Sequence, residues 1–178
     1  RQMCIRDRYV DMVLMYLRLD EGASDYVIRS CDVDEVIRQS LRKFAGEFID
    51  RRLTLHYAPV GLTAVTDEKW LGFVVEQVLS NALKYTPEGG SITIDAEEPA
   101  TLCIRDTGIG IAPEDLPRIF DRGYTGRNGR THRQASGIGL YLCRRICRDL
   151  GHTITAASAV GEGTVIRLDL SRRTGPLE

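Results

Sequence analysis

The stretch DTGIGIAPEDLPRIFDRGYTG, residues 106–126, combines four glycines and two prolines with several large apolar residues. Glycine lets the backbone adopt positive φ angles or lie close to a ligand, because no Cβ atom intervenes. We therefore expect Gly108 and Gly110 to lie against something that is not protein, beside the carboxylate of Asp106. The surrounding loop, residues 107–136, is long for a compact domain, and such loops are usually functional or disordered.

Strand patterns lie on both sides of this stretch. SITIDAEE and TLCIRD precede it, with a turn at residues 98–99, and HTITAAS and GTVIRLDL follow it. Between the stretch and the last two strands, GIGLYLCRRICRDL predicts a helix that ends at Gly151, because glycine is favoured directly after a helix. Further upstream, LTLHYAP and TAVT predict two short strands.

Helical patterns occupy the rest of the chain. Asp32, with Glu35 three residues later, is a start signal for one helix. Thr66 or Asp67 begins a second helix that runs to about Tyr85. The buried face of this second helix is expected to contain Leu71, Val74, Val75, Val78, Leu79 and Ala82. Residues 9–19 also have helical spacing, with Val10, Val13, Leu14 and Leu17 on one face.

Three groups of polar and small residues suggest chemistry. Gln77, Asn81 and Lys84 project from one face of the second helix, although an exposed polar face is the ordinary alternative. Asp106 ends a strand, where its carboxylate can accept a hydrogen bond from an amine beside the flexible glycine backbone. Gly137 and Gly139 open a helix, and the free N–H groups at a helix N-terminus suit phosphate.

The order of these motifs resembles the ATP-binding domain that sensor histidine kinases share with gyrase-type topoisomerases, heat-shock chaperones and mismatch-repair proteins, the GHKL or HATPase_c superfamily. EQVLSNALKYTPEGG is similar to the N box, DTGIGI to the first glycine box, RIF to the F box, GIGL to the second glycine box and GEGTVIRL to the closing strand. The amino-acid sequences of the N box and the lid are similar to those of small bacterial kinases that respond to cell-envelope or antibiotic stress.

This resemblance implies an α+β fold. The expected architecture is a two-layer α/β sandwich, the Bergerat fold, in which three helices cover one face of a mixed, mostly antiparallel sheet and a long lid closes over ATP. Residues 1–8 fit no pattern and are interpreted as a non-native leader. Residues 9–24 are interpreted as the end of the dimerisation helix hairpin with its hinge, residues 25–172 as the catalytic ATP-binding domain, and residues 173–178 as a tail.

The resemblance also implies roles for individual residues. Asn81 would bind Mg²⁺ and Lys84 would contact phosphate, which makes both catalytic, while Gln77 is a second candidate ligand of the metal. Asp106 would accept from the adenine amine, and Thr164 would act near it through water, although an ordinary strand threonine explains Thr164 equally well. The other residues expected at the nucleotide or its lid are Tyr85, Gly108, Gly110, Ile111, Phe120, Gly137, Gly139 and Leu140.

Gln77 is a departure from the family pattern. Histidine kinases usually have a second asparagine at this position, and the hydrolysing ATPases have a glutamate base. Glutamine cannot take a proton from water, so we expect slow ATP hydrolysis by the domain alone. The neighbouring Glu76 lies about 100° away around the helix and is expected to be a salt-bridge or surface residue. The lid contains four arginines, Arg122, Arg127, Arg130 and Arg133. Two interpretations remain open: the arginines belong to a solvated loop, or at least one of them senses phosphate.

The implied function is transfer of the γ-phosphoryl group of ATP to a histidine on an upstream dimerisation helix. The histidines present, His56, His132 and His152, do not stand in such a helix. Expected partners are ATP and ADP, the protein's own helix hairpin, a response regulator and a second copy, in the cytoplasmic part of a bacterial inner-membrane protein. The alternatives are a regulatory nucleotide-binding module of the same fold and an anti-sigma-factor serine kinase.

Composition excludes several other classes. The formal net charge of −1 gives no basic footprint for nucleic acid or for an anionic membrane, and no apolar run approaches the length of a membrane span. The five cysteines form no C-x-x-C pair, and their odd number argues against a disulfide framework. Cys143 and Cys147 are expected to face the core as free thiols.

Overall fold

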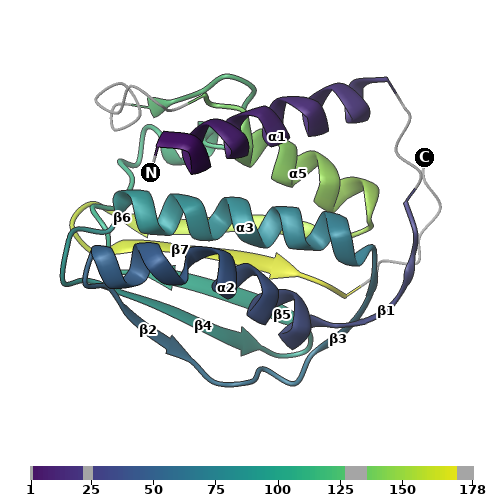
Figure 1. Ribbon diagram of the computed structural model, residues 1–178, viewed down its shortest axis with the longest axis horizontal. Coiled ribbons are helices and arrows are strands. Elements are labelled where there is room, and N and C mark those ends of the chain that lie inside the picture. The colour runs from purple at the N-terminus through teal and green to yellow at the C-terminus, as the bar shows by residue number, and fades with distance from the viewer. Residues whose placement is uncertain (1, 22–25, 127–135, 172–178) are drawn as a thin grey trace.

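The computed structural model describes residues 2–21, 26–126 and 136–171, and its centre is a mixed sheet of five strands (Figure 1). The strands lie in the order β2 (Thr54–Tyr57), β4 (Ser91–Glu97), β5 (Thr101–Asp106), β7 (Gly163–Asp169) and β6 (Thr153–Ala159). Strand β2 is parallel to β4, and every other neighbouring pair in this sheet is antiparallel. Strands β1 (Arg29–Asp32) and β3 (Thr63–Thr66) form a separate antiparallel pair.

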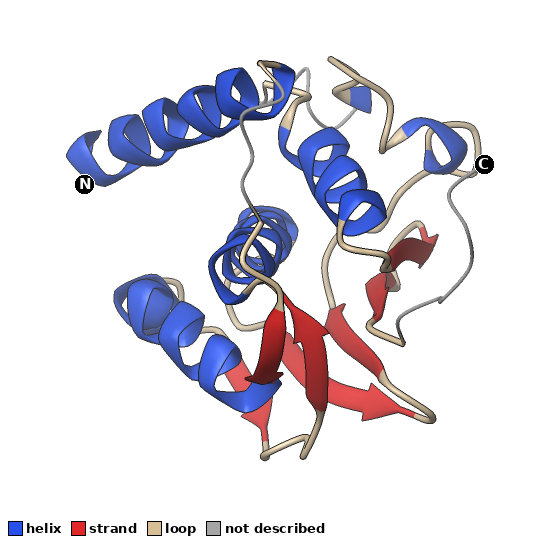
Figure 2. Ribbon diagram, turned by 90° about the vertical axis from the view of Figure 1, so that its right-hand side faces the viewer, coloured by secondary structure: helices blue, strands red, loops and turns tan. Residues whose placement is uncertain are grey.

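Three helices cover one face of this sheet, as the sequence predicts (Figure 2). They are α2 (Val33–Asp50), α3 (Glu68–Tyr85) and α5 (Gly139–Asp149), with α3 between the other two. One hydrophobic core lies between the helices and the sheet. The predicted face of α3 is buried throughout, because every residue of the apolar stripe from Leu71 to Ala82 is at most 4% exposed. The two-layer α/β sandwich is therefore confirmed.

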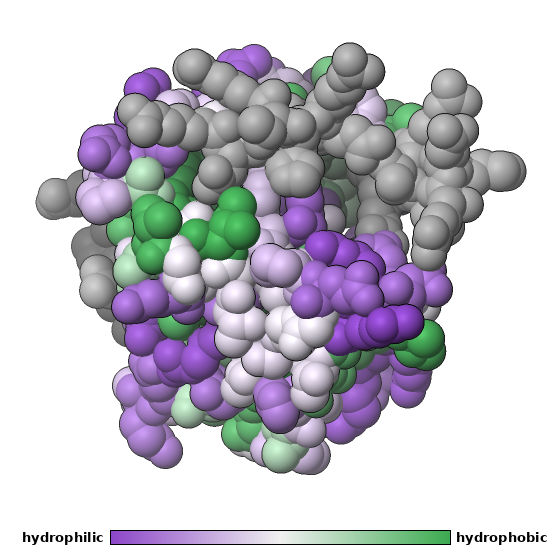
Figure 3. Space-filling model, turned by 90° about the vertical axis from the view of Figure 1, so that its left-hand side faces the viewer, coloured by the Kyte–Doolittle hydropathy of each residue, from purple (hydrophilic) through white to green (hydrophobic). Residues whose placement is uncertain are grey.

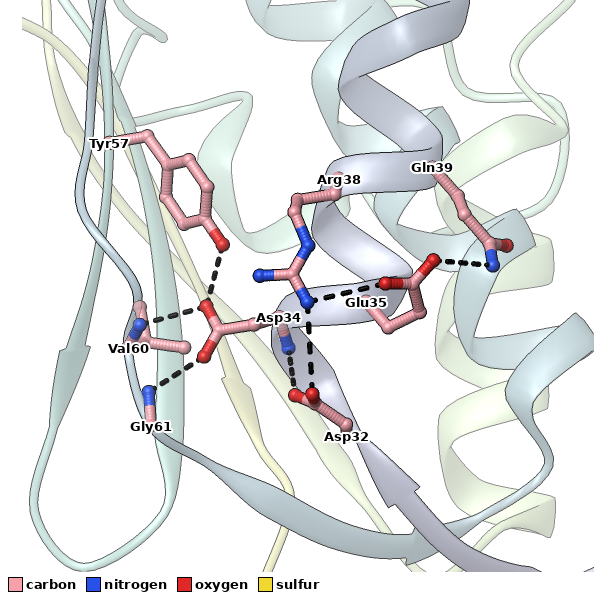
Figure 4. A network of polar contacts seen from close by, with 8 residues as sticks. All are labelled: Asp32, Asp34, Glu35, Arg38, Gln39, Tyr57, Val60 and Gly61. Atoms are coloured by element: carbon pink, nitrogen blue, oxygen red, sulfur yellow. Dashed lines mark hydrogen bonds and ion pairs between the residues drawn. The ribbon is translucent and has the colours of Figure 1, made fainter.

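The start of α2 is fixed by two aspartates with different tasks (Figure 4). Asp32 caps the helix by accepting a hydrogen bond from the backbone N–H of Asp34. Glu35, the other residue of the start signal, accepts from Arg38 and Gln39 one turn further along the helix. The helix begins where the start signal predicts.

The second of these aspartates, Asp34, is buried and binds the connection between β2 and β3. Its carboxylate accepts from the hydroxyl of Tyr57 at 2.6 Å and from the backbone N–H groups of Val60 and Gly61, each at 2.8 Å. Burial alone would raise the pKa of Asp34, but these three hydrogen bonds outweigh it and lower the pKa. Asp34 therefore joins α2 to the strand connection as a buried, satisfied anion.

Helix α1 (Gln2–Asp20) contains the predicted helical segment, but most of the predicted apolar face does not pack against the domain. Val10, Leu14 and Leu17 are about half exposed, whereas Met12 and Leu19 are buried. Arg145 of α5 donates to Asp20 and to the carbonyl oxygen of Leu19, which ties α1 to α5. Helix α1 has apolar residues on two faces, and its spacing cannot say which of them the domain covers.

Candidate functional site

A cavity of about 1850 Å³ brings together most of the predicted site residues. Figure 3 views the end of the molecule that is on the left in Figure 1, where hydrophobic side chains form small patches among hydrophilic ones. Residues from the sheet, from α3, from α5 and from the loop after β5 line the cavity. The predicted residues among them are Gln77, Asn81, Lys84, Tyr85, Asp106, Gly110, Ile111, Gly137, Gly139, Leu140 and Thr164.

Strands β5 and β7 form the floor of this cavity. Ile104 and Asp106 point to the helix-covered face of β5 because side chains two residues apart share a face of a strand. Their cross-strand partners on β7 are Ile166 and Thr164, respectively. All four side chains line the cavity. The floor is therefore apolar at the two isoleucines and polar at Asp106 and Thr164.

Asp106 is held by one of its two carboxylate oxygens. Its Oδ1 accepts from the backbone N–H of Gly108 at 2.8 Å and from that of Thr164 at 3.2 Å. Oδ2 accepts no hydrogen bond from the part of the chain that the structure describes. Burial raises the pKa of Asp106, and the two N–H groups only partly oppose this change. The side chain thus offers the cavity one oriented acceptor.

Two glycines beside Asp106 allow backbone to touch backbone. A Cβ atom on Gly110, whose φ is +72°, would lie 2.0 Å from the carbonyl oxygen of Ala159. A Cβ atom on Gly163 would lie 1.9 Å from the carbonyl oxygen of Asp106. No other residue fits at either position without moving the chain, so the loop after β5 lies directly on the turn between β6 and β7.

Helix α3 supplies the polar wall. Neither Gln77 nor Asn81 has a hydrogen-bond partner within the described residues, and both side chains are half-buried. The Lys84 ammonium lies 5.1 Å from the centroid of the Tyr85 ring. Burial lowers the pKa of Lys84, and no carboxylate of the described residues pairs with it. The wall therefore presents free amide oxygens and an uncompensated cation.

The N-terminus of α5 faces the same space. Ile138 occupies the N-cap position without a side-chain hydrogen bond to the helix, and the N–H groups of Gly139 and Leu140 donate to no described residue. A Cβ atom on Gly139 would lie 2.8 Å from Oε1 of Gln77, so the glycine lets α5 approach α3 closely. Gly137 has a φ of +68° and packs against the backbone of Gly123.

Two predicted site residues, Gly108 and Phe120, do not line the cavity. Gly108 acts behind the wall, since a Cβ atom there would lie 2.7 Å from both Asp106 Oδ1 and the carbonyl oxygen of Tyr85. Phe120 packs against the hydrophobic core, and the Arg144 guanidinium lies 5.9 Å from the centroid of its ring. Gly108 therefore lies where it can support Asp106, and Phe120 lies where it can attach the lid to the core.

The structure also shows the surroundings of Glu76, Arg122 and two cysteines near the site. Glu76 pairs with Lys43 at 2.6 Å, which confirms the salt-bridge alternative. The Arg122 guanidinium lies 5.1 Å from the Tyr16 ring, whereas Arg127, Arg130 and Arg133 lie outside the described residues. Cys143 and Cys147 are buried free thiols, as expected, and burial raises the pKa of both.

Sequence reasoning missed Ser158 on β6 as a residue of the site. Its hydroxyl lies 2.9 Å from that of Thr164, accepts from the Ile111 N–H at 2.8 Å and donates to the Gly163 carbonyl at 2.7 Å. The strand alternation of HTITAAS gives the face of Ser158, but only the strand order shows that it lies opposite Thr164.

Membrane-spanning helices and metal-binding side-chain clusters are both absent from the described residues. No helix in the described ranges is long and apolar enough to span a membrane. No cluster of three or more histidine, cysteine, aspartate or glutamate side chains suited to a metal ion occurs among the residues that the structure describes.

Comparison with known proteins places the chain in one family. Residues 66–174 match the family described as histidine kinase-, DNA gyrase B-, and HSP90-like ATPase. The sensor histidine kinase YxdK of Bacillus subtilis is 34% identical over 167 residues, which are 89% of this chain and 50% of YxdK. The sensor protein kinase GraS of Staphylococcus aureus is 43% identical over 106 residues, which are 58% of this chain and 30% of GraS.

A similar solved structure also comes from a sensor histidine kinase. The mycobacterial sensor histidine kinase MprB has 27% sequence identity and a TM-score of 0.69, over 81% of this chain and 97% of that one. The chain spans about half the length of YxdK and less than a third of GraS. Because the family match covers more than half of the 178 residues, the chain belongs to the family of histidine kinase-, DNA gyrase B- and HSP90-like ATPases, whose domains bind ATP.

Proposed function

We propose that this chain is the ATP-binding catalytic part of a two-component sensor histidine kinase. It would donate the γ-phosphoryl group of ATP to a histidine on an upstream dimerisation helix. One observation carries the proposal: a single cavity has an oriented carboxylate acceptor, Asp106, on its floor and, on its wall, the half-buried cation Lys84, which pairs with no carboxylate of the described residues. A molecule with an amine-bearing base and a chain of phosphates matches both groups.

The base end is explained by Asp106 and the glycines. Oδ2 of Asp106 is the acceptor for an exocyclic amine, and Oδ1 is already held by two backbone N–H groups. Ile104 and Ile166 supply apolar surface for a flat ring. Gly110, which has no side chain, and Ile111 line the adjoining wall.

The phosphate end is explained by Lys84 and α5. Lys84 is half-buried and pairs with no carboxylate of the described residues, so an anion beside it would offset the cost of removing its charge from water. The free N–H groups of Gly139 and Leu140 and the positive end of the helix dipole add attraction for phosphate. Gly137 lines the cavity next to this helix end, and a Cβ atom there would lie 2.5 Å from the backbone of Gly123.

Mg²⁺ fits the residues on α3. Asn81 lines the cavity, its amide has no partner among the described residues, and an amide oxygen is a hard ligand of the kind that Mg²⁺ prefers. Gln77 offers a second amide on the same face, although its Oε1 packs beside Gly139. Bound Mg²⁺ would neutralise charge on the phosphates during transfer.

Phosphoryl transfer requires mainly positioning and charge neutralisation, and Asn81 and Lys84 are placed for both. We place the acceptor histidine on another segment, because His56 is exposed on β2 and His152 is buried away from the cavity lining, so that neither stands in a helix. His132 lies outside the described residues. The exposed apolar face of α1, with Val10, Leu14 and Leu17, supports packing within a helix hairpin and a homodimer. A response regulator would then receive the phosphoryl group at the cytoplasmic side of a membrane.

The alternative functions differ in what they transfer. A regulatory nucleotide-binding module would bind ATP without transfer, and Gln77 is the residue that favours it, since it provides no base. An anti-sigma-factor serine kinase normally has no helix hairpin before the domain, whereas α1 precedes it here. The similarity to sensor kinases along 89% of the chain supports the histidine kinase.

The test is phosphoryl transfer to a hairpin that is supplied separately. The chain is incubated with radiolabelled ATP alone, with a dimerisation hairpin that carries the acceptor histidine, and with the same hairpin plus the Asn81→Ala variant. We expect no label on the chain itself, acid-labile label on the hairpin that increases with hairpin concentration, and little label with the variant. ATP binding without hairpin labelling at high concentration would instead support the regulatory module.

A further inference from the structure

We propose that Ser158 is a positioning residue that makes this site select 6-amino purines over 6-oxo purines. It would do so by fixing the direction of the Thr164 hydroxyl group, so that the base pocket presents hydrogen-bond acceptors only. This inference rests on the proposed function, namely that the cavity binds an adenine nucleotide. It adds a residue that does not touch the ligand and a reason for base selection.

The three polar residues concerned form a row across the sheet. Asp106 on β5 lies opposite Thr164 on β7, and Thr164 lies opposite Ser158 on β6. Directly paired residues of neighbouring strands have side chains on the same face. Asp106 and Thr164 line the cavity, whereas Ser158 lies behind Thr164 and does not.

The hydrogen-bonding capacity of Ser158 is fully used. A serine hydroxyl has one proton to donate and two lone pairs that accept. Ser158 Oγ lies 2.7 Å from the carbonyl oxygen of Gly163, which can only accept, so the serine proton points there. The backbone N–H of Ile111 donates to Oγ at 2.8 Å. One lone pair remains, and Thr164 Oγ1 lies 2.9 Å away.

It follows that Thr164 is the donor in its contact with Ser158. The proton of Thr164 is then directed away from the cavity, and only its lone pairs face the ligand. Asp106 Oδ2 is likewise an acceptor. An amino group at the 6-position of a purine, or a water that donates to Thr164, meets two acceptors there. A 6-oxo group would place a third acceptor beside them, and like partial charges repel at this distance.

The experiment compares ADP with inosine diphosphate, which carries the 6-oxo group, by calorimetry on the whole chain. The wild type should bind ADP more tightly. In Ser158→Ala the Thr164 hydroxyl is free to rotate and donate, so the ADP preference should fall by about threefold to tenfold, mainly through tighter binding of inosine diphosphate. Ser158→Cys, which is similar in size but a weak acceptor, should shift the preference in the same direction.

A double-mutant cycle separates this role from general support of the fold. If Ser158 acts through the hydroxyl of Thr164, the preference of Ser158→Ala/Thr164→Val must equal that of Thr164→Val alone. Ser40→Ala is the control, because it also removes a serine hydroxyl that donates to a backbone carbonyl, here the buried hydroxyl of Ser40, which is bonded to the Val36 carbonyl outside the cavity. It should leave the preference unchanged.

A failure of the proposed function and a failure of this inference alone would give different results. No binding of ADP by the wild type refutes the proposed function and this inference with it. Intact ADP binding with the same preference in Ser158→Ala and Ser158→Cys refutes the inference alone. Additive effects of Ser158→Ala and Thr164→Val on the preference would also refute it, since the serine would then act by another route.

Discussion

The Asp106→Asn substitution tests the base end of the site, because the structure fixes how the asparagine must lie. The backbone N–H groups of Gly108 and Thr164 both donate to the Oδ1 position. The asparagine oxygen must therefore occupy that position, since the opposite orientation would place its NH₂ group against two donors. The NH₂ group then takes the place of Oδ2 and faces the adenine amine, donor against donor.

The expected loss follows from this orientation. One hydrogen bond to a charged group contributes about 1.5–3 kcal/mol, which corresponds to about 10- to 150-fold weaker ADP binding at 25 °C. The substitution should also invert the base preference, because an NH₂ group can donate to a 6-oxo oxygen. Calorimetry with ADP and inosine diphosphate measures both effects.

Stability provides the control for this experiment. Burial raises the pKa of Asp106, so the charged carboxylate is less favourable in the folded chain than in the unfolded one. For a raised pKa, the contribution to stability is present at low pH and is lost as the pH rises through the folded-state pKa. At pH 7, a neutral asparagine should therefore leave the free energy of unfolding unchanged or increase it. Equal ADP affinity, or equal losses for both nucleotides, would remove Asp106 from base recognition.

Two further substitutions test features that support the site. Asp34→Asn should lower the free energy of unfolding by about 1–3 kcal/mol, because an NH₂ group would face the Gly61 N–H. The lowered pKa of Asp34 means that its carboxylate stabilises the fold above about pH 4 and loses this effect as the pH falls, so the variant should show a weaker pH dependence in urea unfolding below pH 4; an unchanged acid profile would contradict this. Gly110→Ala should unfold more easily than Gly61→Ala and should lose ADP binding, since both positions have positive φ but only the first would bring a Cβ atom against the Ala159 carbonyl. Equal thermal midpoints for these two variants would show that the close approach is unimportant.

The sequence predicts the helices and their buried faces well where one apolar stripe is present. In α3 the stripe, the Asp67 cap and the end at Tyr85 all agree with the structure, because local capping and periodicity determine them. Helix α1 shows the limit, since Met12 and Leu19 are covered and Val10 is not. Its two apolar faces are equivalent in the sequence, and the choice depends on tertiary contacts with α5.

Some residues of the site could be predicted because the order of the sequence motifs is enough to locate them. Asp106, Asn81 and Lys84 reach one cavity because each lies at the end of an element that meets the same edge of the sandwich. Ser158 and the Asp34 contacts were not predictable. Ile111, which donates to Ser158, lies 47 residues away, and the partners of Asp34 lie 23 to 27 residues away. A serine on a strand or an aspartate on a helix looks the same in the sequence whether or not such a partner exists.

The backbone contacts at Gly110 and Gly163 also limit how this site can diverge in evolution. Every amino acid other than glycine carries a Cβ atom, which would meet a main-chain oxygen at about 2 Å in both places. Neither position can therefore drift through a neutral intermediate toward a new ligand. Inheritable change in base preference has to come through side chains that project from the strands, such as Asp106 and Thr164, while the glycine frame stays the same. Laboratory libraries that seek a new nucleotide preference should randomise those side chains and leave both glycines in place.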